Sequence, residues 1–482
     1  MRIKLFILLQ LLPVLLFAQG QNNIWYFGNN AGITFNTSPP TALTDGQLVT
    51  GEGCAAICDH AGNLLFYTDG NTVYNRNHVV MVNGSGLFGQ YSSTQSAIIV
   101  PLPGSMTVYY IFTLDAFANA HGVCYSIVDM TLDGGLGAVT TKNTQILTPA
   151  SEKITAIKHA NNQDFWIVIH GWNDNKFYSY SFTSSGLNLT PIITPIGSIH
   201  TGGGGPNNAN NAIGYMKVNA AGNTIALAVT MLYFYELFQF DKITGVLSNM
   251  ISLGNPDNAT NKYPYALEFS PDNHYLYIKD FYSLNVYQYD MTVYNQSSVI
   301  NSKTFVGTVS GNPIYFNGGM QLGPDNKIYI VKFDSDSLAI INNPNNPAAT
   351  CGLVDNAISL NGRNGQLGLP CLVNTSFFNN EVIIPTEDTS EIWFPNTFTP
   401  NGDGINDVFK AEGLNIFDFH IIIFNRWGQQ IFESFSIYDG WDGTFKGKKS
   451  PEGIYVWMAD YLLYRNHTKV KEHARGKILL VR

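Results

Sequence analysis

Hydrophobic and polar positions alternate in short runs along most of the chain, and tight polar turns separate the runs. One copy reads YALEFSPDNHYLYIKD (residues 265–280), with apolar residues at every second position on each side of its turn. The turn centres are roughly forty to sixty residues apart, and they lie near Asn63, Gly104, Asn162, Asn223, Asn273 and Asn326. This period, with two to four strands in each copy, predicts a β-propeller in which each sheet packs on the next.

The two ends of this region predict how such a ring would close. GQLGLPCLVNTSFF (Gly365–Phe378) has the pattern of a single first strand, and NIWYFGNNAGITFN (Asn23–Asn36) has the pattern of the strands that it lacks. Because pairing the chain ends removes exposed sheet edges, we expect a ring of seven blades over residues 22–378. Six blades with the termini packed outside is the alternative, and two sandwiches would explain the period poorly.

Residues 391–482 show a second pattern of strands and strong turns. Strand-like runs occur at Phe419–Asn425, Gly453–Tyr464 and Lys477–Val481, with Asp-Gly turns between them. Their number and size predict a small antiparallel, Ig-like β-sandwich. A connector rich in acidic residues, NNEVIIPTEDTS (residues 379–390), separates the two regions. The chain is therefore predicted to be all-β with two domains.

The first 18 residues have the pattern of a cleavable secretory signal peptide. Arg2 and Lys4 precede an apolar run, and the small residue Ala18 stands before polar sequence. A membrane anchor is the alternative, but the run is short and is interrupted by Gln10 and Pro13. No later stretch is apolar over the length that a membrane span needs. The sequence therefore predicts an exported mature chain without a transmembrane segment.

Composition and charge favour an exported, turn-rich β protein. The chain has 45 glycines, 13% aromatic and only 13% charged residues, and a formal net charge of −9. Residues 391–482 hold 11 Lys and Arg against 11 Asp and Glu. The other 15 basic and 24 acidic residues lie before them and account for the whole −9. A domain that is acidic and poor in Lys and Arg is not suited to bind nucleic acid.

Five cysteines lie at positions 54, 58, 124, 351 and 371, without a CxxC pair or a Cys/His spacing that suits zinc. Cys54 and Cys58 are four residues apart on one predicted strand, about 13 Å, which is too far for a disulfide within that strand. Cys351 and Cys371 could pair across a loop in an oxidising compartment. Buried free thiols fit the sequence equally well.

Four blocks near the C-terminus resemble a known export signal: FPNTFTPNGDGINDVF (394–409), IFNRWGQQIFES (423–434), YDGWDGTFKGK (438–448) and SPEGIYVW (450–457). In content and order they are similar to the gliding-motility-associated C-terminal domain, the type B sorting signal of the type IX secretion system. The preceding region resembles a propeller-like passenger found before such domains. The positions that carry the sorting motif are Pro395, Asn396, Phe398, Thr399, Pro400, Asn401, Gly402, Asp403, Gly404, Asn406, Asp407, Arg426, Trp427, Gly428, Trp441, Asp442, Gly443, Gly453 and Tyr455.

The resemblance implies that residues 391–482 act as an address and not as a catalyst. In that family the domain directs a folded passenger across the outer membrane, and a surface peptidase removes the signal. The implied partners are the type IX secretion machinery and this peptidase, and the implied location is secreted or at the outer cell surface. Basic residues crowd the chain end, either as a solvated strand edge or for docking to an acidic export component: Arg465, Lys469, Lys471, Arg475, Lys477 and Arg482.

One loop of the sorting motif is a candidate cation site. Asn401, Asp403 and Asp407 in NGDGIND offer oxygen ligands of the kind that Ca²⁺ prefers. The spacing lacks the distant bidentate Glu of an EF-hand loop, and Asn and Asp also hydrogen-bond to their own turns. No other cofactor is predicted.

Enzyme motifs are absent from the sequence: there is no P-loop, no HExxH and no GxSxG. The glycine-rich run His200–Pro206 has neither the strand-turn-helix context nor the Lys of a phosphate-binding loop, so we expect a flexible loop between blades.

Acidic residues near strand ends could converge on the centre of the ring for glycoside chemistry, although turn acids are the commoner case: Asp69, Asp115, Asp280, Asp334 and Asp336. An aromatic group could stack on sugars or pack between blades: His170, Trp172, Tyr178 and Tyr180.

Two functions from different classes therefore remain. The favoured hypothesis is a non-enzymatic, exported binding or adhesion protein with an unknown protein or glycan ligand. The alternative is a secreted polysaccharide hydrolase or lyase with its site on the propeller face. A structural part of the motility or adhesion machinery is a third possibility, supported only by the resemblance of the tail.

Overall fold

The computed structural model describes residues 20–254, 263–311, 317–373, 391–403, 406–414, 416–434, 437, 439–465 and 468–482. The chain divides into two compact units, residues 1–379 and 380–482. The predicted signal peptide and the predicted connector lie outside the described residues.

Antiparallel strands that follow one another in sequence make up the N-terminal unit. The first sheet contains β1 (Ile24–Phe27), β2 (Ala31–Thr34) and β3 (Thr41–Leu43). The second contains β4 (Ala55–Cys58), β5 (Leu64–Thr68), β6 (Thr72–Asn75), β7 (Val80–Ser85), β8 (Ala97–Pro101), β9 (Val108–Leu114), β10 (Val123–Asp129) and β11 (Ala138–Leu147). The third contains β12 (Ala150–Lys158), β13 (Phe165–Gly171), β14 (Lys176–Thr183), β15 (Gly186–Leu187) and β16 (Ile192–Pro195). The eight-stranded sheet consists of two meanders, β4–β7 and β8–β11, joined where β7 pairs with β11.

Three four-stranded sheets follow. The first contains β17 (Met216–Val218), β18 (Thr224–Val229), β19 (Phe234–Phe240) and β20 (Leu247–Gly254). The second contains β21 (Pro264–Phe269), β22 (Tyr275–Asp280), β23 (Asn285–Asp290) and β24 (Thr304–Thr308). The third contains β25 (Asn317–Leu322), β26 (Ile328–Lys332), β27 (Ser337–Ile341) and β28 (Leu353–Ser359). The short helix α1 (Gln296–Asn301) lies between β23 and β24. Its N-cap is Asn295, whose side chain accepts from two backbone N–H groups of the first turn.

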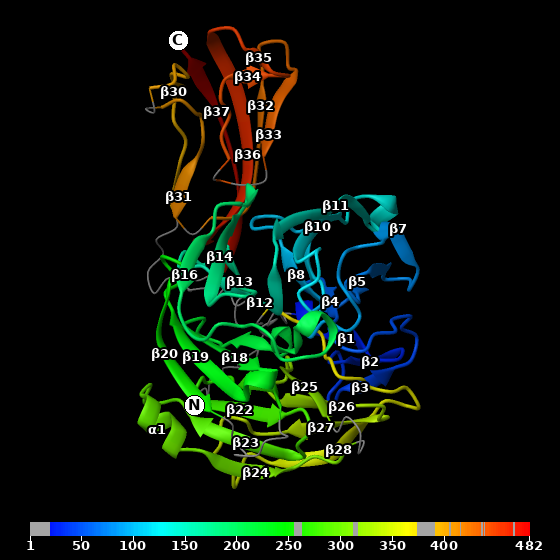
Figure 1. Cartoon of the computed structure of the whole chain (residues 1–482). Helices are drawn as coiled ribbons and strands as arrows, with labels where there is room; N and C mark the ends of the chain where they lie inside the picture. The colour runs from blue at the N-terminus through cyan, green and yellow to red at the C-terminus, as the bar shows by residue number, and fades with distance from the viewer. Residues whose placement is uncertain are drawn as a thin grey trace, which may run out of the picture. The chain divides into compact units, whose positions relative to one another are not determined.

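The meanders surround a common centre (Figure 1). The first strands of successive meanders contact one another in the order β4, β8, β12, β17, β21 and β25, and β1 contacts β4. The first sheet also packs on the last one, because Trp25 meets Tyr329 edge to face with ring centroids 5.5 Å apart. Both belong to one buried cluster with Leu338 and Ile340. The N-terminal unit is thus all-β and propeller-like, as its period predicts.

The ends of the ring meet through single backbone bridges. Asn29 pairs with Asn364, Ser335 with Gly365, and Cys54 with Pro370. The sequence predicts a regular strand over Gly365–Phe378, but the described part of this range, up to residue 373, makes only such isolated bridges. The physical reason is that its backbone bonds go to several segments instead of one partner strand: Leu367 N donates to Gly51 O, Gly319 N donates to Leu367 O, and Cys371 N donates to Cys54 O.

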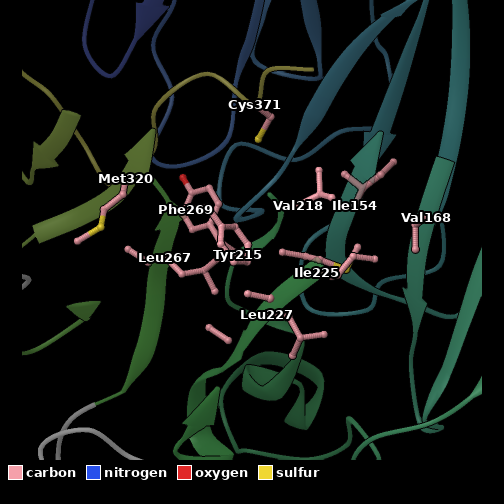
Figure 2. Close-up of a cluster of buried hydrophobic side chains, with 14 of the residues drawn as sticks. Ile154, Val168, Tyr215, Val218, Ile225, Leu227, Leu267, Phe269, Met320 and Cys371 are labelled. Carbon is pink, nitrogen blue, oxygen red and sulfur yellow. The ribbon is translucent and has the colours of Figure 1, made fainter. Parts of the chain in front are cut away.

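The core between meanders is apolar and closely packed (Figure 2). Ile154 of β12, Val218 of β17, Leu267 of β21 and Met320 of β25 belong to one buried cluster. The four apolar positions around the turn at Asn273 are fully or almost fully buried: Leu267, Phe269, Leu276 and Ile278. The residues between them, Ala266, Glu268 and Tyr277, are buried as well, so these two strands are covered on both faces and burial does not alternate along them.

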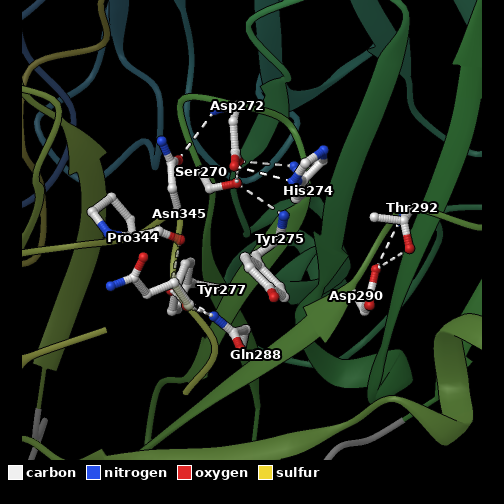
Figure 3. Close-up of polar contacts among 11 residues, drawn as sticks. Ser270, Asp272, His274, Tyr275, Tyr277, Gln288, Asp290, Thr292, Pro344 and Asn345 are labelled. Carbon is white, nitrogen blue, oxygen red and sulfur yellow. Dashed lines mark hydrogen bonds and ion pairs between the residues drawn. The ribbon is translucent and has the colours of Figure 1, made fainter. Parts of the chain in front are cut away.

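The turn between β21 and β22 shows why this polar sequence recurs (Figure 3). Ser270 Oγ donates to Asp272 Oδ1 at 2.6 Å, and the backbone N–H groups of His274 and Tyr275 donate to Asp272 Oδ1 and Ser270 Oγ. Asn273 takes φ 67°, a left-handed conformation that Asn tolerates. Asp272 N also donates to Asn345 Oδ1 at 3.2 Å, which links this turn to the next meander.

The C-terminal unit is built on a five-stranded sheet in the order β30–β37–β36–β32–β33. Its strands are β30 (Thr397–Phe398), β32 (Phe417–Phe424), β33 (Gln430–Ser434), β36 (Gly453–Arg465) and β37 (Thr468–Leu480), accompanied by two small sheets, β29 (Glu391–Trp393) with β31 (Glu412–Leu414) and β34 (Thr444–Phe445) with β35 (Lys448–Lys449). β37 is much longer than the predicted run Lys477–Val481. The prediction was too short because the outward positions of β37 are basic or polar, and pairing with β36 defines the strand.

All five cysteines are buried, and their thiols are free. Cys351 and Cys371 therefore match the alternative of buried free thiols. Burial raises the pKa of Cys58 to about 12 and raises that of Cys54 well above its ordinary value.

Candidate functional site

The Asn401 loop of the sorting motif is stabilised by its own side chains. Asp403 N donates to Asn401 Oδ1 at 3.0 Å, Asn401 Nδ2 donates to Asp403 Oδ2 at 2.9 Å, and Gly402 N donates to Asp407 Oδ1 at 2.7 Å. These are the turn bonds that Asn and Asp commonly make. A cation at Asn401, Asp403 and Asp407 stays a prediction, and Gly404 lies outside the described residues.

The turn between β32 and β33 exposes the sorting-motif residue Trp427 to solvent. Asn425 Oδ1 accepts the N–H groups of Trp427 and Gln429, both at 3.0 Å, and Gly428 takes φ 77°. The side chain of Trp427 is 74% exposed, and the guanidinium of Arg426 lies 4.8 Å from its ring centroid. Trp427 therefore presents its ring to solvent.

Other sorting-motif residues make the core of the same unit. The rings of Phe398 and Trp441 are 5.3 Å apart, and those of Trp441 and Tyr455 are 4.7 Å apart. Trp441 Nε1 donates to Thr444 O at 2.7 Å, and Asp442 Oδ1 accepts the N–H and hydroxyl of Thr444. The motif therefore combines residues that build the fold with residues that remain on its surface.

A groove lies beside this exposed turn, and we call it the β33 groove. It has a volume of about 580 Å³ and runs between the β32–β33 turn, the β34–β35 hairpin and the start of β36. Its lining combines aromatic and basic side chains with the sorting-motif residues Gly453 and Tyr455, and it includes Arg426, Trp427, Ile431, Phe445, Lys448 and Lys449.

The five strand-end acids singled out in the N-terminal unit serve separate local bonds. Asp69 Oδ1 accepts the backbone N–H groups of residues 71 and 72, and Asp115 accepts those of residues 116 and 121. Asp280 accepts the hydroxyl of Tyr235 at 2.9 Å, and Asp334 accepts Asn364 Nδ2 at 2.9 Å. The backbone carbonyl of Asp336 accepts Leu360 N at 2.6 Å.

Two other carboxylates, Glu52 and Glu152, are buried in the N-terminal unit. Tyr265 Oη donates to Glu52 Oε2 at 2.8 Å, and the N–H and hydroxyl of Thr94 both donate to Glu152 Oε2 at 2.8 Å. Burial, with the neighbouring Glu152 charge, raises the pKa of Glu52 to about 8, and burial also raises that of Glu152. Glu52 is 8% exposed and Glu152 is fully buried. Sequence reasoning missed them; the available signal was a charged residue at the entry of an otherwise apolar strand.

Further titratable side chains are buried close by. Lys153 Nζ donates to Ala212 O at 2.7 Å, and burial lowers its pKa to about 7. Glu236 accepts the N–H and hydroxyl of Ser198, and burial raises its pKa to about 7. His170 stacks on His200 with ring centroids 3.6 Å apart, and burial lowers the pKa of His170 to about 3.

The glycine-rich run is a loop between β16 and β17, as predicted. All four glycines have positive φ, between 69° and 99°, and a three-residue 3₁₀ helix, Pro206–Asn208, follows them. The aromatic residues that the sequence offered for stacking on sugars are mostly buried: His170 is fully buried, Trp172 is 8% exposed and Tyr180 is 2% exposed. Tyr178 donates to Asp174 Oδ2 at 3.2 Å. These residues pack within the unit and do not form an open stacking surface.

A second aromatic group is more accessible, and we call it the Tyr263 cluster. Tyr233, Tyr263, Phe281 and Tyr282 are all half-buried. Tyr233 stacks on Tyr263 at 5.4 Å, and Tyr263 meets Tyr282 edge to face at 5.2 Å. They lie in the loops that follow β18, precede β21 and follow β22, so two neighbouring meanders contribute. Phe281 also contacts Tyr265, the partner of Glu52.

This geometry defines a chain with a propeller-like unit and a separate β unit, whose motif is partly buried and partly exposed. Residues 392–480 match the model of the CHU_C Type IX secretion signal domain. The chain thus carries a type IX secretion signal, is handled by the type IX secretion machinery, and is secreted or located at the outer surface. None of the described helices has the length and apolar character needed to cross a membrane.

Several solved structures are similar to part of this chain. They include a protein from Lactobacillus plantarum (14% identity, 73% of this chain and 99% of that chain, TM-score 0.43). They also include a periplasmic gluconolactonase from Pseudomonas aeruginosa (10% identity, 78% and 96%, TM-score 0.39) and an auxiliary nutrient binding protein from Bacteroides thetaiotaomicron (12% identity, 64% and 73%, TM-score 0.36). No curated protein matches the sequence.

In the described part of the chain, no group of three or more His, Cys, Asp or Glu residues is placed to hold a metal ion. The buried titratable groups around Lys153 instead use backbone and side-chain partners of the protein itself.

Proposed function

We propose that the chain is an exported cell-surface binding protein, with a seven-bladed β-propeller over residues 22–378 as its scaffold. Seven successive strand groups support this blade count: β1–β3, β4–β7, β8–β11, β12–β16, β17–β20, β21–β24 and β25–β28. Residues 391–482 would form the Ig-like sorting domain, and cleavage near residues 379–390 by a surface peptidase would release it.

The Tyr263 cluster is the observation that carries the binding role. Tyr233 and Tyr263 keep half-exposed rings on loops of two neighbouring meanders, where core packing does not require them. Aromatic faces with hydroxyl groups suit the apolar faces and hydroxyls of sugar rings. Since ligand sites gather on loops held by a rigid scaffold, we assign the cluster to a glycan ligand.

The test compares two sets of alanine variants of the full chain. Replacing Tyr233, Tyr263 and Tyr282 together should abolish retention on insoluble polysaccharides or on a glycan array without a change in melting temperature. The control is Phe305→Ala, because Phe305 is 52% exposed on β24, outside the cluster. Equal binding of both variants and the native chain would contradict the proposal.

The second candidate function is hydrolysis of a polysaccharide, which the pair Glu52 and Glu152 favours. Glycoside hydrolysis uses two carboxyl groups, one as general acid and the other as nucleophile or base. Glu52 and Glu152 are two carboxyls whose pKa values are raised. Their burial argues against it, since a substrate must reach them. Release of reducing sugar by the native chain, lost in Glu52→Gln or Glu152→Gln, would establish this candidate.

The sorting-motif residues would divide into two roles in export. We infer that Phe398, Trp441 and Tyr455 hold the domain together, whereas Arg426 and Trp427 are read by the machinery. Deletion of residues 391–482 should leave the passenger in the periplasm. Unchanged surface display of the deleted chain would contradict the role of the domain as an address.

A further inference from the structure

The β33 groove is basic. Arg426, Lys448 and Lys449 line it, and both lysines are exposed. Glu452 is the acidic residue of this lining, and its Oε1 already accepts the backbone N–H of Arg482 at 3.0 Å. The groove therefore offers three cations against one engaged carboxylate, which favours an acidic occupant.

The groove lining includes Ile431 of β33 and both residues of β35, two strands that stand at the edge of their sheets. β33 is the last strand of the five-stranded sheet and, in the described residues, pairs only with β32. Among the residues that the structure describes, β35 pairs only with β34. An edge strand presents unpaired N–H and C=O groups at regular spacing, and an extended peptide can satisfy them by adding as a further strand. A polyanionic glycan has no such repeating backbone pattern, so the edges favour a peptide.

An aromatic anchor completes this surface. Trp427 is 74% exposed at the rim, and Arg426 lies over its ring at 4.8 Å. Trp and Arg are the residues that most often dominate the binding energy of protein interfaces. Ile454, 59% exposed, and Phe445 add apolar surface to the same groove.

We propose that the β33 groove binds an extended acidic peptide segment presented by the export machinery, with Trp427 as anchor and Lys448 and Lys449 as the pairing charges. This inference rests on the proposed role of residues 391–482 as an export address. It assigns recognition to one surface of that unit, and it leaves the basic row on β37 outside the contact.

Binding is tested on the purified full chain with a defined probe, a capped ten-residue peptide of alternating Asp and Val. We expect a saturable change in Trp fluorescence, which salt weakens. Lys448→Glu with Lys449→Glu should weaken binding by about tenfold or more, because two attractive charges become repulsive. The matched control, Lys471→Glu with Lys477→Glu, makes the same charge change on β37, outside the groove lining, and should stay within about twofold.

Trp427→Ala should reduce both the affinity and the fluorescence change while the melting temperature stays unchanged. Equal affinities of the groove variant and its control would overturn the proposal. So would the absence of binding to the native chain, or equal binding of polygalacturonate and the acidic peptide.

The same variants are then followed in cells that carry the secretion system. Groove variants should accumulate in the periplasm, and the control pair should reach the surface. If deletion of residues 391–482 blocks export but the groove variants are exported normally, the groove assignment is wrong and the address stands. If the deletion itself leaves export intact, the proposed export role fails first.

Discussion

Glu52 shows how the surroundings of one side chain set its protonation. It precedes β4 in a small, apolar segment, and the hydroxyl of Tyr265 is its closest donor. Burial and the Glu152 charge favour the neutral carboxyl, so its pKa rises to about 8 in the folded chain from an ordinary value of 4.5. A local sequence carries none of this information, because Tyr265 is 213 residues away.

This pKa shift predicts a pH dependence of stability. A carboxyl whose pKa is raised by folding contributes its full stability below about pH 4.5, and that contribution is lost as the pH rises toward about 8. Glu52→Gln does not titrate but can still accept the bond from Tyr265. The native chain should therefore lose stability relative to Glu52→Gln across this range, by on the order of 1–4 kcal/mol. Melting curves of both proteins at several pH values check this, and a constant difference would show that Glu52 does not titrate there.

Trp427 and Trp441 belong to one sequence motif but differ in how far each is exposed to solvent. Both are sorting-motif positions, yet Trp441 is 1% exposed and Trp427 is 74% exposed. We expect Trp441→Ala to destabilise the C-terminal unit by ~3–5 kcal/mol, as for a buried Trp. Trp427→Ala should change stability by less than ~1 kcal/mol. Denaturant unfolding of the two full-chain variants measures the difference, and similar losses would mean that Trp427 also supports the fold.

At the scale of elements, turn chemistry and close approach decide where strands begin and end. The Ser270–Tyr275 turn was predictable, because Ser, Asp and Asn at these positions satisfy the backbone locally. The segment around Gly368 was not, since its form depends on the carbonyl of Glu52, far away in sequence. The length of β37 likewise depends on β36 as a partner.

Two glycines of the same segment allow a matched test of this crowding. In Gly368→Ala the new Cβ meets the backbone oxygen of Glu52 at 1.9 Å, so the bridge region must move, at a cost of ~3 kcal/mol or more. Gly362 has open space around it and φ 79°, so Gly362→Ala should cost only ~1 kcal/mol for the left-handed backbone. Thermal unfolding of both variants gives the comparison. Equal losses would show that the approach of residue 368 to Glu52 is not tight.

At the scale of the whole molecule, the two units differ in charge and in task. All of the net charge of −9 belongs to the residues before 391, while the matched signal domain lies after them. The first and last sheets of the N-terminal unit share a core, so each covers a face that the other would expose.

The buried thiols give a prediction for the native chain. All five cysteines are buried and free, and burial raises the pKa of Cys54, Cys58 and Cys371. A thiol reagent should therefore label the native protein very slowly and label five thiols per chain in denaturant. Fewer than five in non-reducing denaturant would reveal a disulfide, with Cys351 and Cys371 as the first pair to examine.

The sequence by itself determined the all-β class, the repeat period and the sorting motif. These depend on alternation, turn residues and short ordered blocks, which are local properties of the chain. Tertiary structure alone decided that Glu52 and Glu152 are buried near enough to influence each other, which separate partners Asp69, Asp115, Asp280, Asp334 and Asp336 bond to, and which motif residues face solvent. The reason is that closing a ring brings together residues hundreds of positions apart, and burial, pKa and exposure arise only from those contacts.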